Sequence, residues 1–310
     1  MRSGKSSGNI VSLLFIIIPI IFVIVGLWFF PYPVSEEVKG ILPIPLFGSL
    51  ALLFIGFILK KQKIAHIIRI TGWMILAFYW STQPNTLYFG EGQDFVNAFL
   101  CIVGVFVLSY VAYHEWLSIK RNEEVTCLDW FAGVASIAGL IYFIAELTPL
   151  APWLIDVVAA HSAWLLNLFT GVAEAQGPNI YYNGEFAVNI IFACTAVQSM
   201  VIFVGMILPL QKVSMKKKIY GLLVTILPIY FLNMVRNASI AYLLAEDITS
   251  FNMAHNILGK GGSLLALVVL LFVVIKVIPE VFDKILELTD LAKRNGPLEK
   301  GMKKLIGRKT

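Results

Sequence analysis

The chain has 310 residues, 58% of them hydrophobic and only 14% charged, and its mean hydropathy is +0.82. Soluble domains average about 45–50% apolar and about 25% charged residues, so this composition excludes a soluble enzyme, a disordered chain and a disulfide scaffold. The net charge of +5 comes from Lys and Arg in short clusters, a pattern of membrane topology rather than of nucleic-acid binding.

About eight apolar runs approach the length of about 20 residues that a helix needs to cross a bilayer. In chain order they are residues 10–30, 42–59, 64–80, 95–117, 127–147, 186–210, 219–236 and 263–279. The first run has the length of a membrane span and is followed by a poor cleavage context, so it is predicted to be retained. The fold class predicted is therefore all-α, a polytopic membrane helical bundle.

Residues 152–169 form a further apolar stretch, but Asp156, His161 and Asn167 within it would be costly at mid-membrane. With the N-terminus in the cytoplasm and no crossing at this stretch, nearly all Lys and Arg residues lie on the inner side. A crossing here would divide the basic clusters between the two sides. The sequence therefore predicts an outer interfacial helix, with both chain termini in the cytoplasm.

Two segments are predicted from this topology: an integral-membrane domain at 1–279 and a basic cytoplasmic tail at 280–310. Within the tail, 280–294 is predicted to be a short amphipathic helix held against anionic lipid. The sequence contains no evident internal repeat, so an inverted-repeat transporter has no support.

The three cysteines, Cys101, Cys127 and Cys194, lie far apart in apolar surroundings. No C-x-x-C pair and no H-x-x-x-H pair occurs, so neither a disulfide framework nor a zinc site is predicted. We expect no metal and no cofactor.

Cys194 lies within the run 186–210, roughly 12 Å below its outer end if the run is one helix. A free cysteine in a membrane helix is most often a small packing residue. However, Thr195, Gln198 and Ser199 follow it, and polar groups at this depth favour a cavity or partners over lipid.

Arg236 ends the run 219–236 near the outer boundary, where it is an exception to the rule that Lys and Arg lie on the inner side. A snorkelling interfacial arginine is the simpler interpretation. Its neighbours Asn233 and Asn237 could instead orient the guanidinium.

His255 lies in the outer loop before the last span, and His161 is its rival on the same side. His66 and His114 are predicted on the cytoplasmic side and so cannot join them. The topology thus brings Cys194, Arg236 and a histidine to one side at similar depth. Attack on a carbonyl needs these three parts: a thiolate, a proton carrier, and a cation for the oxyanion.

The Phe-Ala-Cys194-Thr195-Ala196 run, the Asn233-x-x-Arg236-Asn237 run and His255 resemble the exosortase and archaeosortase family, the archaeosortase A type most of all. The resemblance is firmest from about 186 to 265, which it marks as the catalytic part. It implies a membrane cysteine transpeptidase that faces outward.

In this resemblance the substrates are surface proteins, such as those of an S-layer, that end in a short Pro-Gly-Phe motif (a PGF-CTERM signal), a hydrophobic helix and a basic end. Cys194 would attack the scissile carbonyl and hold a thioester, which a lipid amine would resolve. Arg236 would stabilise the thiolate and oxyanion, His255 would carry protons, and Thr195, Asn233 and Asn237 would support them. The partners implied are the C-terminal tails of secreted proteins and a lipid acceptor.

Two alternatives stay open from the residues alone. In a transporter or channel, Arg236 and the polar residues would line a solute path, which predicts further charges or broken helices along a complete pathway. A non-catalytic membrane assembly factor is the other. The oligomeric state is not predicted.

Overall fold

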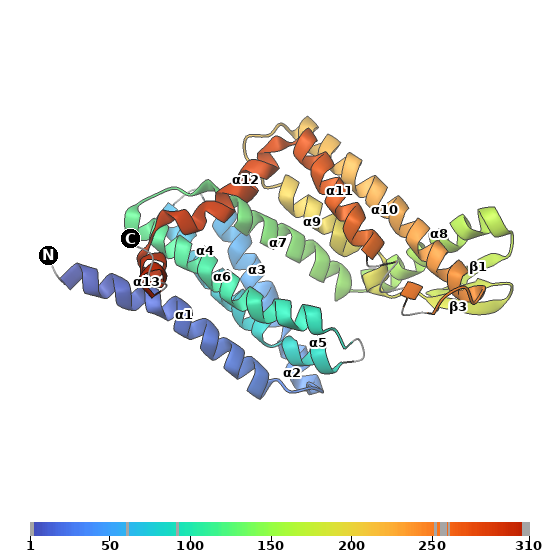
Figure 1. The fold of residues 1–310 in the computed structure, drawn as a ribbon, viewed down its shortest axis with the longest axis horizontal. Helices are drawn as coiled ribbons and strands as arrows, with labels where there is room; N and C mark the ends of the chain where they lie inside the picture. Colours follow the sequence, from blue (N-terminus) through green and yellow to red (C-terminus); the bar gives the residue numbers. More distant parts are fainter. Residues whose placement is uncertain are drawn as a thin grey trace. The chain divides into compact units, whose positions relative to one another are not determined.

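The computed structural model describes residues 3–59, 62–90, 93–250, 253–254, 259 and 261–305. These residues form helices and one small antiparallel sheet (Figure 1). The chain divides into two compact units, one made of Met1–Ser136 with Lys284–Thr310 and the other of Ile137–Asp283. Each unit is described by itself below.

The first unit is a helical bundle in which α4 packs against both α3 and α6, and α1 packs against α6. Its elements are α1 (Ser3–Phe29), α2 (Glu36–Ile41), α3 (Pro43–Ile58), α4 (Gln62–Ser81), α5 (Pro84–Phe89), α6 (Phe95–Arg121), the first half of α7 (Thr126–Glu146), the end of α12 (Pro279–Thr289), the 3-10 helix η3 (Asp290–Arg294) and α13 (Pro297–Leu305).

The second unit places a long helix, α10, beside helices and a sheet (Figure 1). Its elements are the second half of α7, α8 (Leu150–Thr170), β1 (Ala173–Gln176), β2 (Asn179–Tyr182), β3 (Glu185–Asn189), the 3-10 helix η1 (Phe192–Cys194), α9 (Val197–Ile207), α10 (Met215–Ala245), α11 (Gly262–Val277) and the start of α12. Buried residues of α8, the sheet and α10 form one apolar core that includes Cys194.

The described part of the chain has seven helices long and apolar enough to cross a membrane, or up to eight if the bent pair α11 and α12 is one span. The prediction of an all-α polytopic membrane bundle is confirmed. A helix also occupies the stretch predicted at 152–169, as α8. Its length and hydropathy suit a span as well, and its outer-surface position stays a prediction.

The prediction of one continuous span over 186–210 is wrong. Residues 185–189 form strand β3, and the helix that follows, α9, begins only at Val197 and has 11 residues. Ala196, the residue before α9, has φ 62, a left-handed conformation that interrupts a helix. Cys194 therefore lies in the turn that precedes the N-terminal end of a short helix, and not on the face of a long helix.

Two tight turns in the sequence explain why a sheet forms here, and a hydropathy profile does not detect them. Asn183 and Gly184 have φ 53 and 81, the conformation of a two-residue hairpin turn, which Asn-Gly favours. Gly177, with φ 59, precedes Pro178 in the other tight turn. Each turn joins two antiparallel strands, and the order in the sheet is β1-β2-β3.

A buried group of charges joins three helices of the first unit. Arg69 on α4 donates to Glu115 on α6 at 2.7 Å and lies 2.8 Å from Asp129 on α7. His66 also contacts Glu115, and the side chains of Arg69 and Glu115 are 3% and 0% exposed. Charges this deep are stable only as partners of one another, so the group holds α4, α6 and α7 in register.

The C-terminal helix α13, which hydropathy does not predict, docks through a second buried carboxylate. Tyr110 donates to Glu299 Oε1 at 2.8 Å and Tyr113 to Glu299 Oε2 at 3.1 Å, while His114 Nε2 lies 3.3 Å from Oε1. Burial alone would raise the pKa of Glu299, but the nearby His114 ring and hydrogen bonds from its own backbone and from Tyr110 outweigh burial and lower the pKa to about 2.

Docking of α13 is expected to weaken in acid. Because the folded pKa of Glu299 is depressed, its stabilisation is present above its ordinary pKa of 4.5 and is lost as pH falls towards about 2. Glu299→Gln should loosen α13 at neutral pH by about 1.5–3 kcal/mol. Hydrogen exchange of residues 297–305 measures this. The control is Glu287→Gln, which removes a partly exposed ion pair with Lys284, and equal exchange in both variants would contradict the prediction.

Candidate functional site

Cys194 is the last residue of the one-turn helix η1 and is 7% exposed. Its backbone N–H donates to the carbonyl of Ile191 at 2.8 Å. The hydroxyl of Thr195 donates to the carbonyl of Phe192 at 2.7 Å, so a side chain also stabilises the turn around Cys194. The sequence thus holds the thiol on a tight turn that leads into α9, a fixed position for a nucleophile.

The carbonyl of Cys194 is held by two amides of α10. Asn233 Nδ2 donates to this oxygen at 2.8 Å and Asn237 Nδ2 donates to it at 3.1 Å. Asn233 and Asn237 are four residues apart and so share one face of the helix, and they are 7% and 2% exposed. Two of the three predicted supporting residues, Asn233 and Asn237, therefore contact the backbone of Cys194. We call Asn233, Asn237 and the Cys194 carbonyl the amide clamp.

Arg236 lies between the two asparagines on α10. Its Nη1 donates to Asn237 Oδ1 at 3.4 Å, so Asn237 links the guanidinium to the Cys194 backbone. Arg236 Nε is buried, and the described part of the chain offers it no hydrogen-bond partner. A buried guanidinium N–H without a partner is costly, and such groups call for an explanation in function.

Gly259 shows how closely the chain passes the guanidinium. A Cβ placed on Gly259 would lie 3.0 Å from Arg236 Nε and 3.1 Å from Nη2. A side chain at position 259 would therefore press on the guanidinium, which would have to shift by a few tenths of an ångström. The predicted proton carrier, His255, lies outside the described residues. Its role stays a prediction.

The rival histidine, His161, is engaged elsewhere. Its Nδ1 lies 2.6 Å from the hydroxyl of Tyr230, which is on α10 one turn before Asn233. His161 is exposed on α8. The structure therefore places it against the same helix as the amide clamp, although no contact with Cys194 or Arg236 is present.

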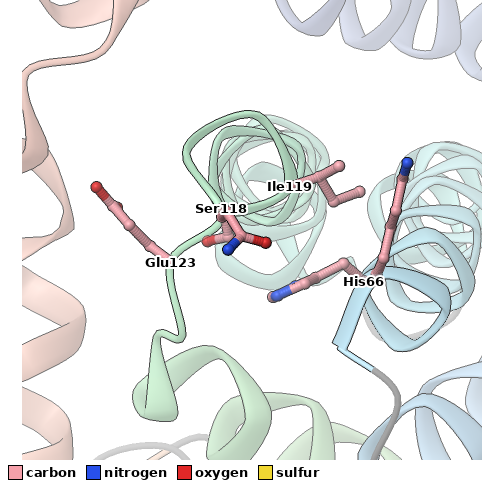
Figure 2. Close-up of a pocket in the computed structure, with 6 residues that line it drawn as sticks. His66, Ser118, Ile119 and Glu123 are labelled. Atoms are coloured by element: carbon pink, nitrogen blue, oxygen red, sulfur yellow. The ribbon is translucent and has the colours of Figure 1, made fainter.

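A cavity of about 150 Å³ lies in the first unit, between α4 and α6 (Figure 2). It is lined by Lys63, His66, Ser118, Ile119, Asn122 and Glu123. None of the residues predicted for the site borders it. Among the residues that the structure describes, no group of His, Cys, Asp and Glu is arranged to hold a metal ion.

Comparison with known families assigns the chain. The family model described as transmembrane exosortase matches residues 11–273, which include the Cys194 turn and the α10 residues. The chain belongs to the transmembrane exosortase family. No curated protein and no solved structure matched it. This exosortase is therefore a multi-pass membrane protein of a cysteine-type transpeptidase family that acts on the C-terminal sorting signals of other proteins.

Sequence reasoning had missed three features around the site of this exosortase: the β-sheet, the left-handed Ala196 and the approach of Gly259 to Arg236. The Asn183-Gly184 pair was a readable hairpin signal. Nothing in the sequence indicated Ala196 or Gly259, because each depends on a contact or a dihedral angle that the fold imposes.

The amide clamp gives a testable difference between its two members. Asn233→Ala should lower the rate of cleavage by about 10-fold, since one of two hydrogen bonds to the carbonyl remains. Asn237→Ala should cost about 10²-fold, because it also releases Arg236. Single-turnover rates with a tailed reporter measure this. Asn167→Ala, which removes a bond to the Ala173 backbone, is the control; equal losses for Asn233 and Asn237 would contradict a link through Arg236.

Proposed function

We propose that this exosortase is of the archaeosortase A type and transfers surface proteins from a C-terminal Pro-Gly-Phe signal to a lipid amine, with Cys194 as nucleophile. The observation that carries this proposal is the amide clamp. Two buried side chains of α10, Asn233 and Asn237, hold the backbone carbonyl of Cys194, and Asn237 also accepts a hydrogen bond from Arg236. A cysteine that only filled space would not need its carbonyl held twice.

In the first step the Cys194 thiolate attacks the scissile carbonyl carbon, a C–S bond forms and the oxygen becomes an oxyanion facing Arg236. The C–N bond then breaks, and the leaving amine takes a proton from the His255 imidazolium. The hydrophobic helix leaves with its basic end, and a thioester remains. In the second step a lipid amine gives its proton to His255 and attacks the thioester, which forms an amide and returns the thiolate.

The active site in this proposal faces outward and both termini are cytoplasmic. Arg236 lies 18 residues after Lys218 on α10, about 27 Å of helix, so the site sits near the boundary opposite the basic cluster at 216–218. A substrate helix that spans the bilayer would present its outer end at this level. Non-helical backbone at such depth must be covered by protein or line a water-filled cavity. The sheet and α8 pack in one core with Cys194 and so cover part of this backbone.

The test is co-expression with a reporter that ends in Pro-Gly-Phe, an apolar helix and a Lys/Arg tail. Cleavage should depend on this exosortase, and the mass of the mature reporter should exceed that of the free acid by the mass of a lipid amine less one water. Release as the free acid would support the protease and contradict the transfer. No processing of the reporter, with both proteins present in the membrane, would contradict the proposal.

The proton carrier is tested by paired variants. His255→Ala should lower the cleavage rate by about 10²–10⁴-fold, the usual contribution of general acid–base catalysis. His161→Ala should retain most of the activity, since its ring bonds to Tyr230, and Tyr230→Phe serves as the matched control. Loss of cleavage in His161→Ala alone would transfer the role to His161. The rates are to be measured across pH 5–9, where a histidine titrates.

A further inference from the structure

Strand β3 is an edge of the sheet. The order β1-β2-β3 leaves it with one neighbour, β2. In the part of the chain that the structure describes, no backbone or side-chain hydrogen bond joins β3 to an element on its other side. Its sequence, Glu185 to Asn189, contains neither Lys nor Pro, the residues with which proteins commonly block an edge.

The pairing with β2 shows which backbone groups point outward. The N–H of Ile190 donates to the carbonyl of Pro178 at 2.8 Å and so points inward. Asn189 pairs with Asn179, and Val188 with Ile180. Because backbone groups alternate between the two sides of a strand, the N–H and C=O of Asn189 lie on the open side.

The open edge leads to the nucleophile. From Asn189 the chain passes through residues 190–193 to Cys194 without another regular element except η1. Ile190 is 3% exposed and Cys194 is 7% exposed, and both belong to the core that joins the sheet to α8 and α10. The edge and the thiol are therefore joined by a short segment whose buried residues pack in the same core.

The sheet is backed firmly enough to receive a further strand. Ile180 and Tyr182 of β2 are 0% and 8% exposed, and they pack in the core with Ala238 and Ala241 of α10. Tyr182 also meets Tyr242 edge-on, with ring centroids 5.9 Å apart. In contrast, Phe186 of β3 is 59% exposed. Figure 1 shows the sheet beside α8 and the end of α10.

We propose that the extended segment of the sorting signal, on the N-terminal side of the scissile bond, pairs with β3 as a fourth strand. This inference rests on the proposed function. A strand added to an open edge gains affinity from backbone hydrogen bonds, which suits signals whose flanking residues vary. Both β3 and the incoming chain run towards Cys194 and then into the membrane, so the pairing is parallel, and it places the scissile carbonyl at the thiol.

The test uses the wild-type protein and a synthetic reporter with a Pro-Gly-Phe motif, an apolar helix and a basic tail. Single backbone N–H groups are methylated in turn over the six residues before the motif. In a parallel pair, alternate residues bond to the neighbouring strand. We expect kcat/KM to fall by about 10-fold or more at every second position and little at those between.

The outcomes separate the two proposals. If the unmethylated reporter is not cleaved in a manner that needs Cys194, the proposed function fails and the strand pairing fails with it. If it is cleaved and the methylation profile is flat, only the pairing is overturned. A flat profile together with a dimer that Asn189→Pro disperses would mean that β3 pairs with a second copy of the chain, which also overturns the inference.

A variant pair gives a second measurement on the protein side. Asn189→Ala removes the side-chain bond to Asn179 and keeps the outward N–H, whereas Asn189→Pro removes both. We expect Asn189→Pro to raise KM by about 10-fold over Asn189→Ala, with kcat much less affected. Equal KM values in two equally folded variants would count against the pairing.

Discussion

Replacing Cys194 by alanine is expected to reduce release of the C-terminal helix by at least about 10³-fold, the scale on which removal of a nucleophile acts. The side chain is small and buried, so the loss of the sulfur should leave the η1 turn and its bonds to Asn233 and Asn237 in place. Cys194→Ser should be nearly as inactive, since a serine hydroxyl is a much weaker nucleophile than a cysteine thiol. Gel mobility of a tailed reporter measures release.

Cys101→Ala and Cys127→Ala are the matched controls, because both replace a cysteine on a helix of the first unit and should leave release unchanged. A thiol-reactive probe added from outside should label Cys194 in detergent, and labelling should stop when substrate is bound. Full processing by either Cys194 variant would remove the protease mechanism altogether. It would favour the transporter or the assembly factor instead.

Replacing Arg236 by glutamine should lower kcat by about 10²–10³-fold with a small change in KM, because the cation acts on charge that develops only during the reaction. Its Nε is buried and has no hydrogen-bond partner among the residues that the structure describes, so it is the donor that this charge would meet. Arg236→Lys should recover part of the rate. It keeps a positive charge but loses the planar fork through which Arg236 also reaches Asn237.

Lys39→Gln is the control for Arg236, since it removes another cation, one whose ion pair with Glu36 is exposed. It should leave kcat unchanged. The decisive measurement is the ratio of kcat for Arg236→Lys to kcat for Arg236→Gln, with both variants equally saturated by the reporter. If Arg236 had only a structural role, this ratio would be close to one. If Arg236→Gln retains full kcat and only KM rises, the guanidinium binds the substrate and does not stabilise the oxyanion.

The helices of this exosortase could be predicted because an apolar run of about 20 residues matches the thickness of the bilayer's hydrocarbon core. The run at 126–146 shows this well, since it was expected at 127–147. The same argument failed at 186–210. The strand β3 and the helix α9 both lie within one largely apolar run, and a sum over hydropathy does not separate them.

The site was predictable to a different extent. Arg236 was identified because topology left its charge unexplained, and Asn233 and Asn237 because they flank it. Their contact with the Cys194 carbonyl was not predictable, because it joins residues 39 and 43 positions apart. Only the packing of α10 against the turn brings these atoms together.

The amide clamp also determines what can move. Pro228 lies inside α10 five residues before Asn233 and cannot donate to the helix ladder, so it is a natural hinge. The backbone of Cys194 is bonded to the part of α10 that follows Pro228. If that part of the helix tilts, the Cys194 thiol and the Arg236 guanidinium move together. The thiol and the guanidinium would then move as one piece, so a change in the tilt of α10 would not alter their separation.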